Sequence, residues 1–232
     1  MTNTTTLLAW RNIWRHPRRT LLTIAAMVFA DVLLIFMLGL QFGQYRMMID
    51  NSLAIFTGQM QVQAEGYNDE PHMYRSITAA DALAQDIRER TQLDAVATRG
   101  YGFALVSSES RTLGVQISGV DPLHEPRVST IPGLISQGRY LGEVDSNEIV
   151  IGSTLARNLK IKPGDELTVL GNGRDGSIAA TVAPVVGIYE SGSRDMDRHM
   201  LSMPLDTFRE VFSMDDQAHS IIIGGARDQA DS

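Results

Sequence analysis

One glycine pattern in the sequence could bind a phosphate group. Residues 171–176 read Gly-Asn-Gly-Arg-Asp-Gly, which matches the GxGxxG spacing of dinucleotide-binding loops and follows a predicted strand. Phosphate binding at such a loop requires a helix directly after the glycines, because the first backbone N–H groups of that helix hold the phosphate. Residues 177–182, Ser-Ile-Ala-Ala-Thr-Val, favour a strand instead. We therefore predict a hairpin turn at residues 171–176, between two antiparallel strands.

The histidines do not have the spacing of a metal site. None is expected to pair with another histidine, or with a carboxylate three or four residues away on a helix, so zinc binding is not predicted. Scattered structural or solvated histidines are the simpler interpretation. The five histidines are His16, His72, His124, His199 and His219.

Two further polar segments carry residue types that occur in reactive sites. Residues 107–110, Ser-Ser-Glu-Ser, lack the flanking glycines of a nucleophile elbow. Residues 194–198, Arg-Asp-Met-Asp-Arg, could bind a cation through their carboxylates, but the alternating charges favour a solvated, self-paired loop. The sequence has no GxxxxGK[ST] motif and no cysteine, which excludes a P-loop, disulfides and thiolate chemistry. We expect a protein that is not an enzyme, with no catalytic residue, cofactor-binding residue or metal ligand.

An apolar segment near the N-terminus has the length and composition of a membrane anchor. Residues 21–40 are almost uninterrupted apolar sequence with one charge, although the mean hydropathy of the chain is near zero. A helix of twenty residues is about 30 Å long, which matches the hydrocarbon core of a bilayer. A buried core helix is rarely apolar on every face over this length. The apolar region of a cleaved signal peptide is shorter, about 7–15 residues. We predict one uncleaved membrane-spanning helix, and a protein with several spans is excluded for these 232 residues.

The charges predict the orientation of this helix. Residues 1–20 carry four arginines and no acid, whereas residues 41–232 hold 16 basic and 26 acidic side chains. By the positive-inside rule the N-terminus is cytoplasmic and the larger part of the chain is extracytoplasmic. The acidic balance offers no basic face for a phosphate backbone, so nucleic-acid binding is not expected.

The regions on either side of the span are also predicted to be helical. Residues 7–20 suit a short amphipathic helix on the inner membrane surface, in contact with lipid, although a simple basic flank is the alternative. Beyond the span, apolar residues recur every three or four positions as far as Phe56, which predicts a helical stalk that ends near Gly58. Asp31, at mid-span, costs on the order of 3 kcal/mol to insert and favours contact with a partner helix.

The remaining residues predict a mixed α+β domain. Thr78 and Asp81 resemble a capping box, before a helix with Ala82, Leu83 and Ile87 turned inward. Short helices are also expected at residues 153–159 and 206–212, and a proline-rich loop at residues 121–133. The predicted strands are residues 59–65, 95–107, 112–120, 148–151, 166–170, 177–189 and 220–223.

The order of these segments resembles the ABC-transporter permeases of the MacB, LolC/LolE and FtsX group. The similar segments follow one another through the chain: AWRNIWRHPRRTLLT, GQMQVQAEGY, ISGVDP, GRYL, EIVIGSTLARNLKIKPGDELTV, VVGIYESG and Met203-Pro204-Leu205. The resemblance implies a cytoplasmic segment at residues 1–19, a transmembrane helix and stalk at 20–57, and a MacB-type periplasmic core domain at 58–232. It also implies a bacterial inner-membrane location, closer to the lipoprotein-release branch than to the division branch.

The resemblance further implies a permease subunit that performs no chemistry itself. In this group a separate cytoplasmic ATPase hydrolyses ATP, and a permease dimer, homo- or heteromeric, transmits the motion to the periplasmic domain for export or lipoprotein release. Members continue with three further spans, so the sequence is interpreted as a front part, a truncated product or an engineered piece of a permease. The alternative is a single-pass anchored binding or sensory module that never couples to ATP.

Overall fold

The computed structural model describes residues 10, 15–52, 58, 60–109, 111–142 and 146–224, with the backbone alone at 46–52. The chain divides into two compact units, residues 1–51 and 52–232. Each unit is described by itself. Half of the amphipathic segment predicted at residues 7–20, namely residues 7–9 and 11–14, lies outside the described residues, and Trp10 is helical.

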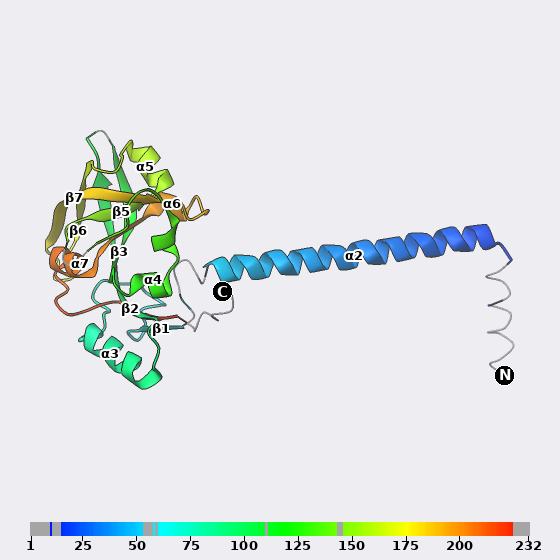
Figure 1. Ribbon diagram of the computed structural model, residues 1–232, viewed down its shortest axis with the longest axis horizontal. Coiled ribbons are helices and arrows are strands. Elements are labelled where there is room, and N and C mark those ends of the chain that lie inside the picture. Colours follow the sequence, from blue (N-terminus) through cyan, green and yellow to red (C-terminus); the bar gives the residue numbers. More distant parts are fainter. Residues whose placement is uncertain are drawn as a thin grey trace. The chain divides into compact units, whose positions relative to one another are not determined.

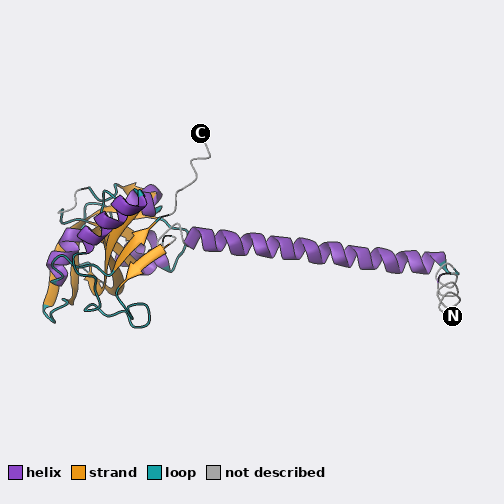
Figure 2. Ribbon diagram, turned by 90° about the horizontal axis from the view of Figure 1, so that it is seen from below, coloured by secondary structure: helices purple, strands orange, loops and turns teal. Residues whose placement is uncertain are grey.

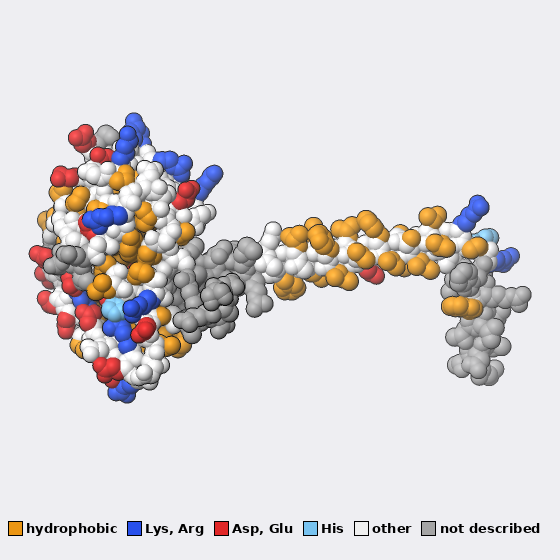
Figure 3. Space-filling model, viewed as in Figure 1, with side chains coloured by type: hydrophobic (Ala, Val, Ile, Leu, Met, Phe, Trp, Pro, Cys, Tyr) orange, Lys and Arg blue, Asp and Glu red, His pale blue; other side chains and the backbone are white. Residues whose placement is uncertain are grey.

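The first unit is dominated by one long helix, α2 (Pro17–Ser52). The most apolar 18-residue window of this helix, within Pro17–Tyr45, has a mean hydropathy of 2.6 and none of it is buried. Apolar side chains run along the helix in Figure 3. The helix begins before the predicted Thr20 because Pro17, with its fixed backbone angle, suits a first helical position. The helix continues without a break through residues 40–43 and extends beyond the apolar segment to Ser52, which confirms one continuous helix over this range. The last predicted stalk residues, 53–57, lie outside the described residues.

The second unit is an α+β domain, as predicted, with strands at its centre and short helices on the outside (Figures 1 and 2). The strands are β1 (Met60–Gln63), β2 (Val96–Ser107), β3 (Thr112–Val120), β4 (Ile135–Gly138), β5 (Ile149–Gly152), β6 (Glu166–Asn172), β7 (Ile178–Tyr189), β8 (Met200–Pro204) and β9 (Ser220–Ile223). The helices are α3 (Ala80–Thr91), α4 (Glu125–Val128), the 3₁₀ turn η2 (Ile131–Leu134), α5 (Ser153–Leu159), α6 (Met196–His199) and α7 (Leu205–Phe212).

Six of the strands close into a ring. Around the ring the order is β2, β3, β8, β5, β7 and β6, and β6 pairs with β2 again. The pairs β3–β8 and β5–β7 are parallel, and the other four are antiparallel. Closure removes free sheet edges from this part of the domain. β4 pairs with β7 outside the ring.

β2 connects the ring to a smaller sheet. Its first residues, 96–99, pair with β9, and its last residues, 104–107, pair with β6. β9 in turn pairs with β1, and Met60 lies opposite Ile223. The two ends of the described domain, Gly58 and Gly224, therefore leave from neighbouring strands.

The inside of the ring is filled by alternate residues of its strands. Inward positions are fully buried while their neighbours face outward, as a half-exposed strand requires. Leu155 and Leu159 of α5 and Phe208 and Phe212 of α7 complete this core. The two phenylalanine rings stack with centroids 4.6 Å apart.

Several elements differ from the prediction. The segment predicted as a proline-rich loop contains α4 and η2, and the sequence did not predict β4 or β8. The capping box was wrong, because residue 79 caps α3 in a left-handed conformation with no side-chain hydrogen bond. The buried face of α3 is formed by Ala80 and Ala84, with Ile87 packed beside them, whereas Ala82 and Leu83 are exposed.

Candidate functional site

The glycine-rich segment 171–176 is a hairpin turn, as predicted. It connects β6 to the antiparallel β7 and is followed by a strand rather than a helix. The Gly173 N–H donates to the Ser177 carbonyl at 2.8 Å, and the Gly176 N–H donates to the Gly173 carbonyl at 3.0 Å. Gly176 has a φ of +81°, a conformation that glycine adopts without strain. Because β7 rather than a helix follows these glycines, the loop lacks the helix N-terminus that holds the phosphate in dinucleotide-binding loops.

Three histidines lie within 4 Å of a carboxylate, although none of these pairs lies on a long helix of the kind for which the sequence was searched. His72 Nε2 lies 4.0 Å from Glu70 Oε2. His124 Nδ1 lies 2.5 Å from Asp121 Oδ2, and His199 Nδ1 lies 3.4 Å from Asp195 Oδ1. The last two pairs form in a turn and beside a four-residue helix, where a search for long helices would miss them. Among the described residues no group of three or more potential ligands surrounds one point.

His219 is the one fully buried histidine among the described residues, and it connects three segments. Its Nδ1 accepts the Tyr101 N–H at 2.9 Å, and its Nε2 lies 3.2 Å from the Met73 carbonyl. This arrangement fixes the neutral ring, because a proton on Nδ1 would face the Tyr101 N–H. Burial lowers the pKa of His219 to about 4. Its ring also packs near Tyr67, whose pKa burial raises to about 12.

The charged segment 194–198 is exposed at Arg194, Asp195 and Arg198, as predicted for a solvated loop, but it continues into the short helix α6 and buries Asp197. Asp197 is only 3% exposed. It accepts hydrogen bonds from the Ser191 hydroxyl at 2.7 Å, from the Ser191 N–H at 3.0 Å and from the Ser153 hydroxyl at 3.2 Å. The carboxylate thus holds the loop after β7 against the start of α5. Its oxygens are occupied by protein donors, so the segment has a structural role.

A buried ion pair joins β2 to α4. Arg99 and Glu125 are both almost fully buried, and the guanidinium donates to both carboxylate oxygens, at 2.5 and 3.1 Å. Burial alone would lower the pKa of Arg99, but the adjacent Glu125 raises it above its ordinary value. The pair is isolated from solvent, and its contacts lie within the domain.

A second arginine joins α7, which packs in the core of the ring, to α3, which packs beside the smaller sheet. Arg209 of α7 donates to both carboxylate oxygens of Asp81 on α3, at 2.6 and 3.0 Å. Asp206 also accepts from Arg209, at 3.2 Å. Burial alone would lower the pKa of Arg209, but the Asp81 contacts raise it. Asp81, predicted to cap its own helix, therefore bonds to a residue 128 positions away.

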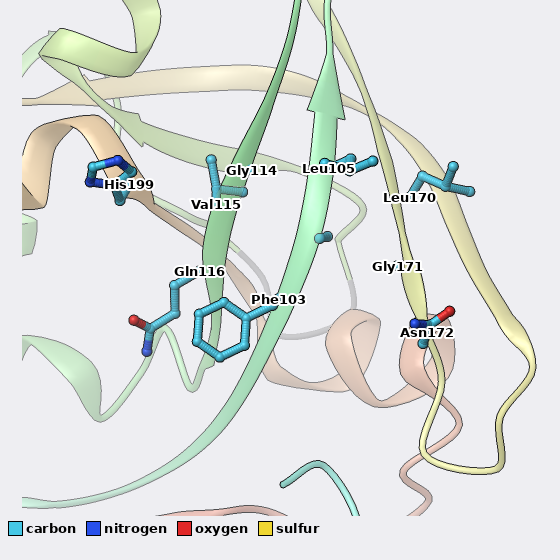
Figure 4. Close-up of a pocket in the computed structure, with 10 residues that line it drawn as sticks. Phe103, Leu105, Gly114, Val115, Gln116, Leu170, Gly171, Asn172 and His199 are labelled. Atoms are coloured by element: carbon cyan, nitrogen blue, oxygen red, sulfur yellow. The ribbon is translucent and has the colours of Figure 1, made fainter. Parts of the chain in front are cut away.

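One apolar surface on the outside of the ring is exposed. Its members lie at outward positions of β2, β6 and β7, where a solvated strand would carry polar residues. Leu105 lies directly opposite Leu170 across the β2–β6 pair (Figure 4). A cavity of about 550 Å³ opens beside them. We call this the outer apolar face, and its members are Phe103, Leu105, Leu170, Ile178 and Val182, 46–78% exposed.

Sequence reasoning missed the outer apolar face, although a signal was present. Residues 103–106, Phe-Ala-Leu-Val, are apolar at consecutive positions, so both faces of the strand are apolar. Contiguous exposed apolar patches are typical of contact surfaces. The buried polar groups described above, by contrast, form their hydrogen bonds and ion pairs within the domain.

The chain therefore combines an apolar helix long enough to span a membrane with an α+β domain built on a closed ring of strands. Residues 20–232 match the family model of the MacB-like periplasmic core domain. The chain belongs to this family.

Two solved structures share the fold. The periplasmic region of MacB from Actinobacillus actinomycetemcomitans is 16% identical, with a TM-score of 0.52, over 76% of this chain and 78% of that one. The extracellular domain of the noncanonic ABC-type transporter YknZ from Gram-positive bacteria is 13% identical, with a TM-score of 0.52, over 73% of this chain and 84% of that one. A search of the curated proteins found no match.

Proposed function

We propose that the chain is a permease subunit of an ABC transporter, or the front part of one. In this role it couples ATP hydrolysis by a separate cytoplasmic ATPase to motion of its extracytoplasmic domain, for export or for lipoprotein release. The match of residues 20–232 to the family model is the observation that carries this proposal. The continuous α2, which runs from the apolar segment to Ser52, supports it.

The structure offers a mechanical route for such coupling. The 36 residues of α2 form a rod of roughly 54 Å, with no proline after Pro17. A displacement that reaches Gly58 enters the domain at β1 and passes through the β1–β9 and β9–β2 hydrogen bonds. β2 is itself a member of the closed ring, so the ring moves with it.

The remaining parts of the proposal concern location and partners. Residues 1–19 lie on the cytoplasmic surface in contact with lipid, residues 20–57 form the transmembrane helix and stalk, and residues 58–232 form the periplasmic core domain. The membrane is the bacterial inner membrane. Asp31 contacts a partner helix, and a second permease copy completes the transporter. The mechanism requires no catalytic residue in this chain.

Orientation can be tested directly because the chain has no cysteine. Single variants Thr4→Cys and Arg174→Cys each place one thiol on one side of the proposed span. A membrane-impermeant maleimide added to cells with a permeabilised outer membrane should label Arg174→Cys. It should label Thr4→Cys only after the inner membrane is lysed. Labelling of both residues while the inner membrane is still intact would refute the proposed orientation.

Coupling to an ATPase requires a second experiment. The tagged full chain is extracted from its native membrane in a mild uncharged detergent, and the eluate is assayed for vanadate-sensitive ATP hydrolysis. A single-span protein with the same tag is the matched control. The proposal predicts ATPase activity that copurifies only with this chain. A correctly oriented chain without any ATPase would support the alternative, an anchored binding module.

The mass of the native product in isolated membranes bears on the same question. An antibody against residues 60–220 should detect a band well above 25.5 kDa if further spans follow in the native protein. A band at 25.5 kDa would favour the anchored module.

A further inference from the structure

A cavity of about 520 Å³ lies between α5, β4 and the end of β7. Three cationic side chains line it, Arg157, Lys160 and Lys162. Lys160 and Lys162 are the only lysines in the 232-residue chain. Figure 3 shows basic side chains along the edge of the domain where α5 runs in Figure 1. A chain with a net charge of −7 thus concentrates positive charge at one hollow.

Arg157, Lys160 and Lys162 form no ion pair with a carboxylate of the described residues. Within the described residues no carboxylate lies within 4 Å of any of the three, whereas five arginines elsewhere in the domain make ion pairs, namely Arg75, Arg90, Arg99, Arg139 and Arg209. The Arg157 guanidinium donates only to the Thr154 hydroxyl, at 3.1 Å. Glu190 is the one carboxylate among the described lining residues, so positive charge predominates in the cavity.

Stabilisation of the helix end does not account for the cluster. Lys160 is the C-cap of α5, where a cation interacts favourably with the helix dipole. Lys162 lies beyond the helix, and its backbone N–H donates to Asp165 Oδ2 at 2.8 Å while its side chain remains exposed. Ser136, Gln137 and Ser153 also line the cavity. The two serine hydroxyls donate within the fold, to the Ile188 carbonyl and to Asp197, whereas the Gln137 amide adds a neutral donor beside the cations.

The cavity lies at the end of the domain away from its chain ends. The hairpin after β2 contacts α5, because the Ser108 hydroxyl donates to the Leu159 carbonyl at 3.0 Å and Arg111 donates to the Asn158 carbonyl at 2.6 Å. The opposite end of β2 pairs with β9, beside Gly58 and Gly224. The twelve residues of β2 separate the two ends by roughly 36 Å.

We propose that this cavity binds a phosphorylated ligand through Arg157, Lys160 and Lys162. Lysine and arginine are the side chains that bind phosphate in proteins, as point charges and as a planar fork respectively. A concave site with an amide group beside the cations fits a phosphate group on a small molecule or headgroup better than a flat acidic protein surface. This site is independent of ATP coupling elsewhere in the transporter.

The test measures the binding of inorganic pyrophosphate to the full chain in an uncharged detergent by titration calorimetry. The variant Lys160→Gln/Lys162→Gln removes two charges from the cavity. Glutamine is suitable at position 160, where φ is +59°, because Gln92 already occupies the equivalent left-handed cap after α3. The control Arg127→Gln/Arg174→Gln removes the same charge from exposed sites elsewhere.

The cavity variant should bind pyrophosphate at least about tenfold more weakly, because charge-assisted hydrogen bonds are lost. The control should change the affinity by less than about twofold. Equal weakening in both variants, or no binding by the unaltered chain at about 10 mM, would overturn the proposal. Thermal unfolding of each variant verifies that the fold is retained.

The source of the phosphate is distinguished by competition. If dihexanoylphosphatidate, a soluble phospholipid, displaces pyrophosphate, the ligand is a lipid headgroup. If glucose 6-phosphate displaces it and the phospholipid does not, the ligand is a free phosphorylated molecule. A polyglutamate peptide that binds the cavity more tightly than either would refute a phosphate site in favour of an acidic protein partner.

Discussion

A single methyl group at Gly119 is expected to destabilise the domain, because no space remains between β3 and the Phe208 ring. A Cβ at Gly119 would lie 2.5 Å from Phe208 Cβ and 2.6 Å from Cγ, whereas ordinary contacts begin near 3.4 Å. The ring cannot move aside. Phe208 is fully buried, stacks on Phe212 and covers Gly100, which lies opposite Gly119 in the β2–β3 pair.

The magnitude follows from two opposing effects. Overpacking a buried site costs about 1–3 kcal/mol. Replacing glycine by alanine restricts the unfolded chain and, where there is room, stabilises by about 0.4–1 kcal/mol. Gly114→Ala in the same strand is the matched control, because nothing lies within 4 Å of a Cβ there. We expect the two variants to differ by about 2–3 kcal/mol, with Gly119→Ala the less stable.

Urea unfolding of the full chain in dodecyl maltoside micelles measures this difference. The circular dichroism signal near 218 nm reports the domain's strands. With a slope of about 2 kcal/mol per molar urea, the midpoints of the two variants should differ by roughly 1 M. The slopes should agree, because both variants expose the same surface on unfolding.

A double-mutant cycle identifies the cause. Phe208→Leu creates space beside residue 119, so adding Gly119→Ala to it should cost much less than the same change in the unaltered chain. A coupling of about 1–2 kcal/mol is expected for residues in direct contact. If Gly119→Ala is as stable as Gly114→Ala, or if Phe208→Leu gives no relief, the close packing described here is wrong.

Three further outcomes are expected. The pKa of His219 is about 4 in the folded chain and 6.5 when unfolded, so the unfolded state binds the proton first and stability falls as the pH drops from 6.5 to 4, by about 3 kcal/mol. Unfolding midpoints at pH 7 and 4.5 should show this loss, and His219→Gln should reduce it. Glu125→Gln leaves Arg99 buried without a charged partner and should cost about 3–5 kcal/mol, whereas Asp86→Asn, which breaks an exposed pair, should cost at most about 1 kcal/mol. Phe103→Thr should change the unfolding free energy by no more than about 0.5 kcal/mol, since the ring is 68% exposed, and a loss of several kcal/mol would show that the ring packs in the core.

The sequence predicted the elements that depend on local periodicity. The strand at 112–120 and the helix at 153–159 have the predicted bounds, and the hairpin at 171–176 is confirmed. The long helix was predictable because its apolar residues cover every face. Residues 200–204 were not predicted as a strand because all five are buried, so they show no alternation.

Polar side chains were harder to place, because their partners lie far away in the sequence. Asp81 has the spacing of a helix cap but bonds to Arg209 instead. Asp197 lies in a segment with the pattern of a solvated loop, yet it is buried by contacts with Ser191 and Ser153. Local spacing predicts only local hydrogen bonds, and these carboxylates gain more from donors that the fold brings to them.

By itself the sequence determined the membrane anchor, its predicted orientation and the mixed α+β class, because hydrophobic runs, charge asymmetry and residue periodicity are local properties. Only the tertiary structure decided that six strands close into a ring, since β2 must pair with β9 at one end and β6 at the other. It also decided that the outer apolar face is exposed and that both lysines share one cavity. Such features depend on which distant strands become neighbours, and pairing between distant strands is set by the packing of the whole core rather than by adjacent residues.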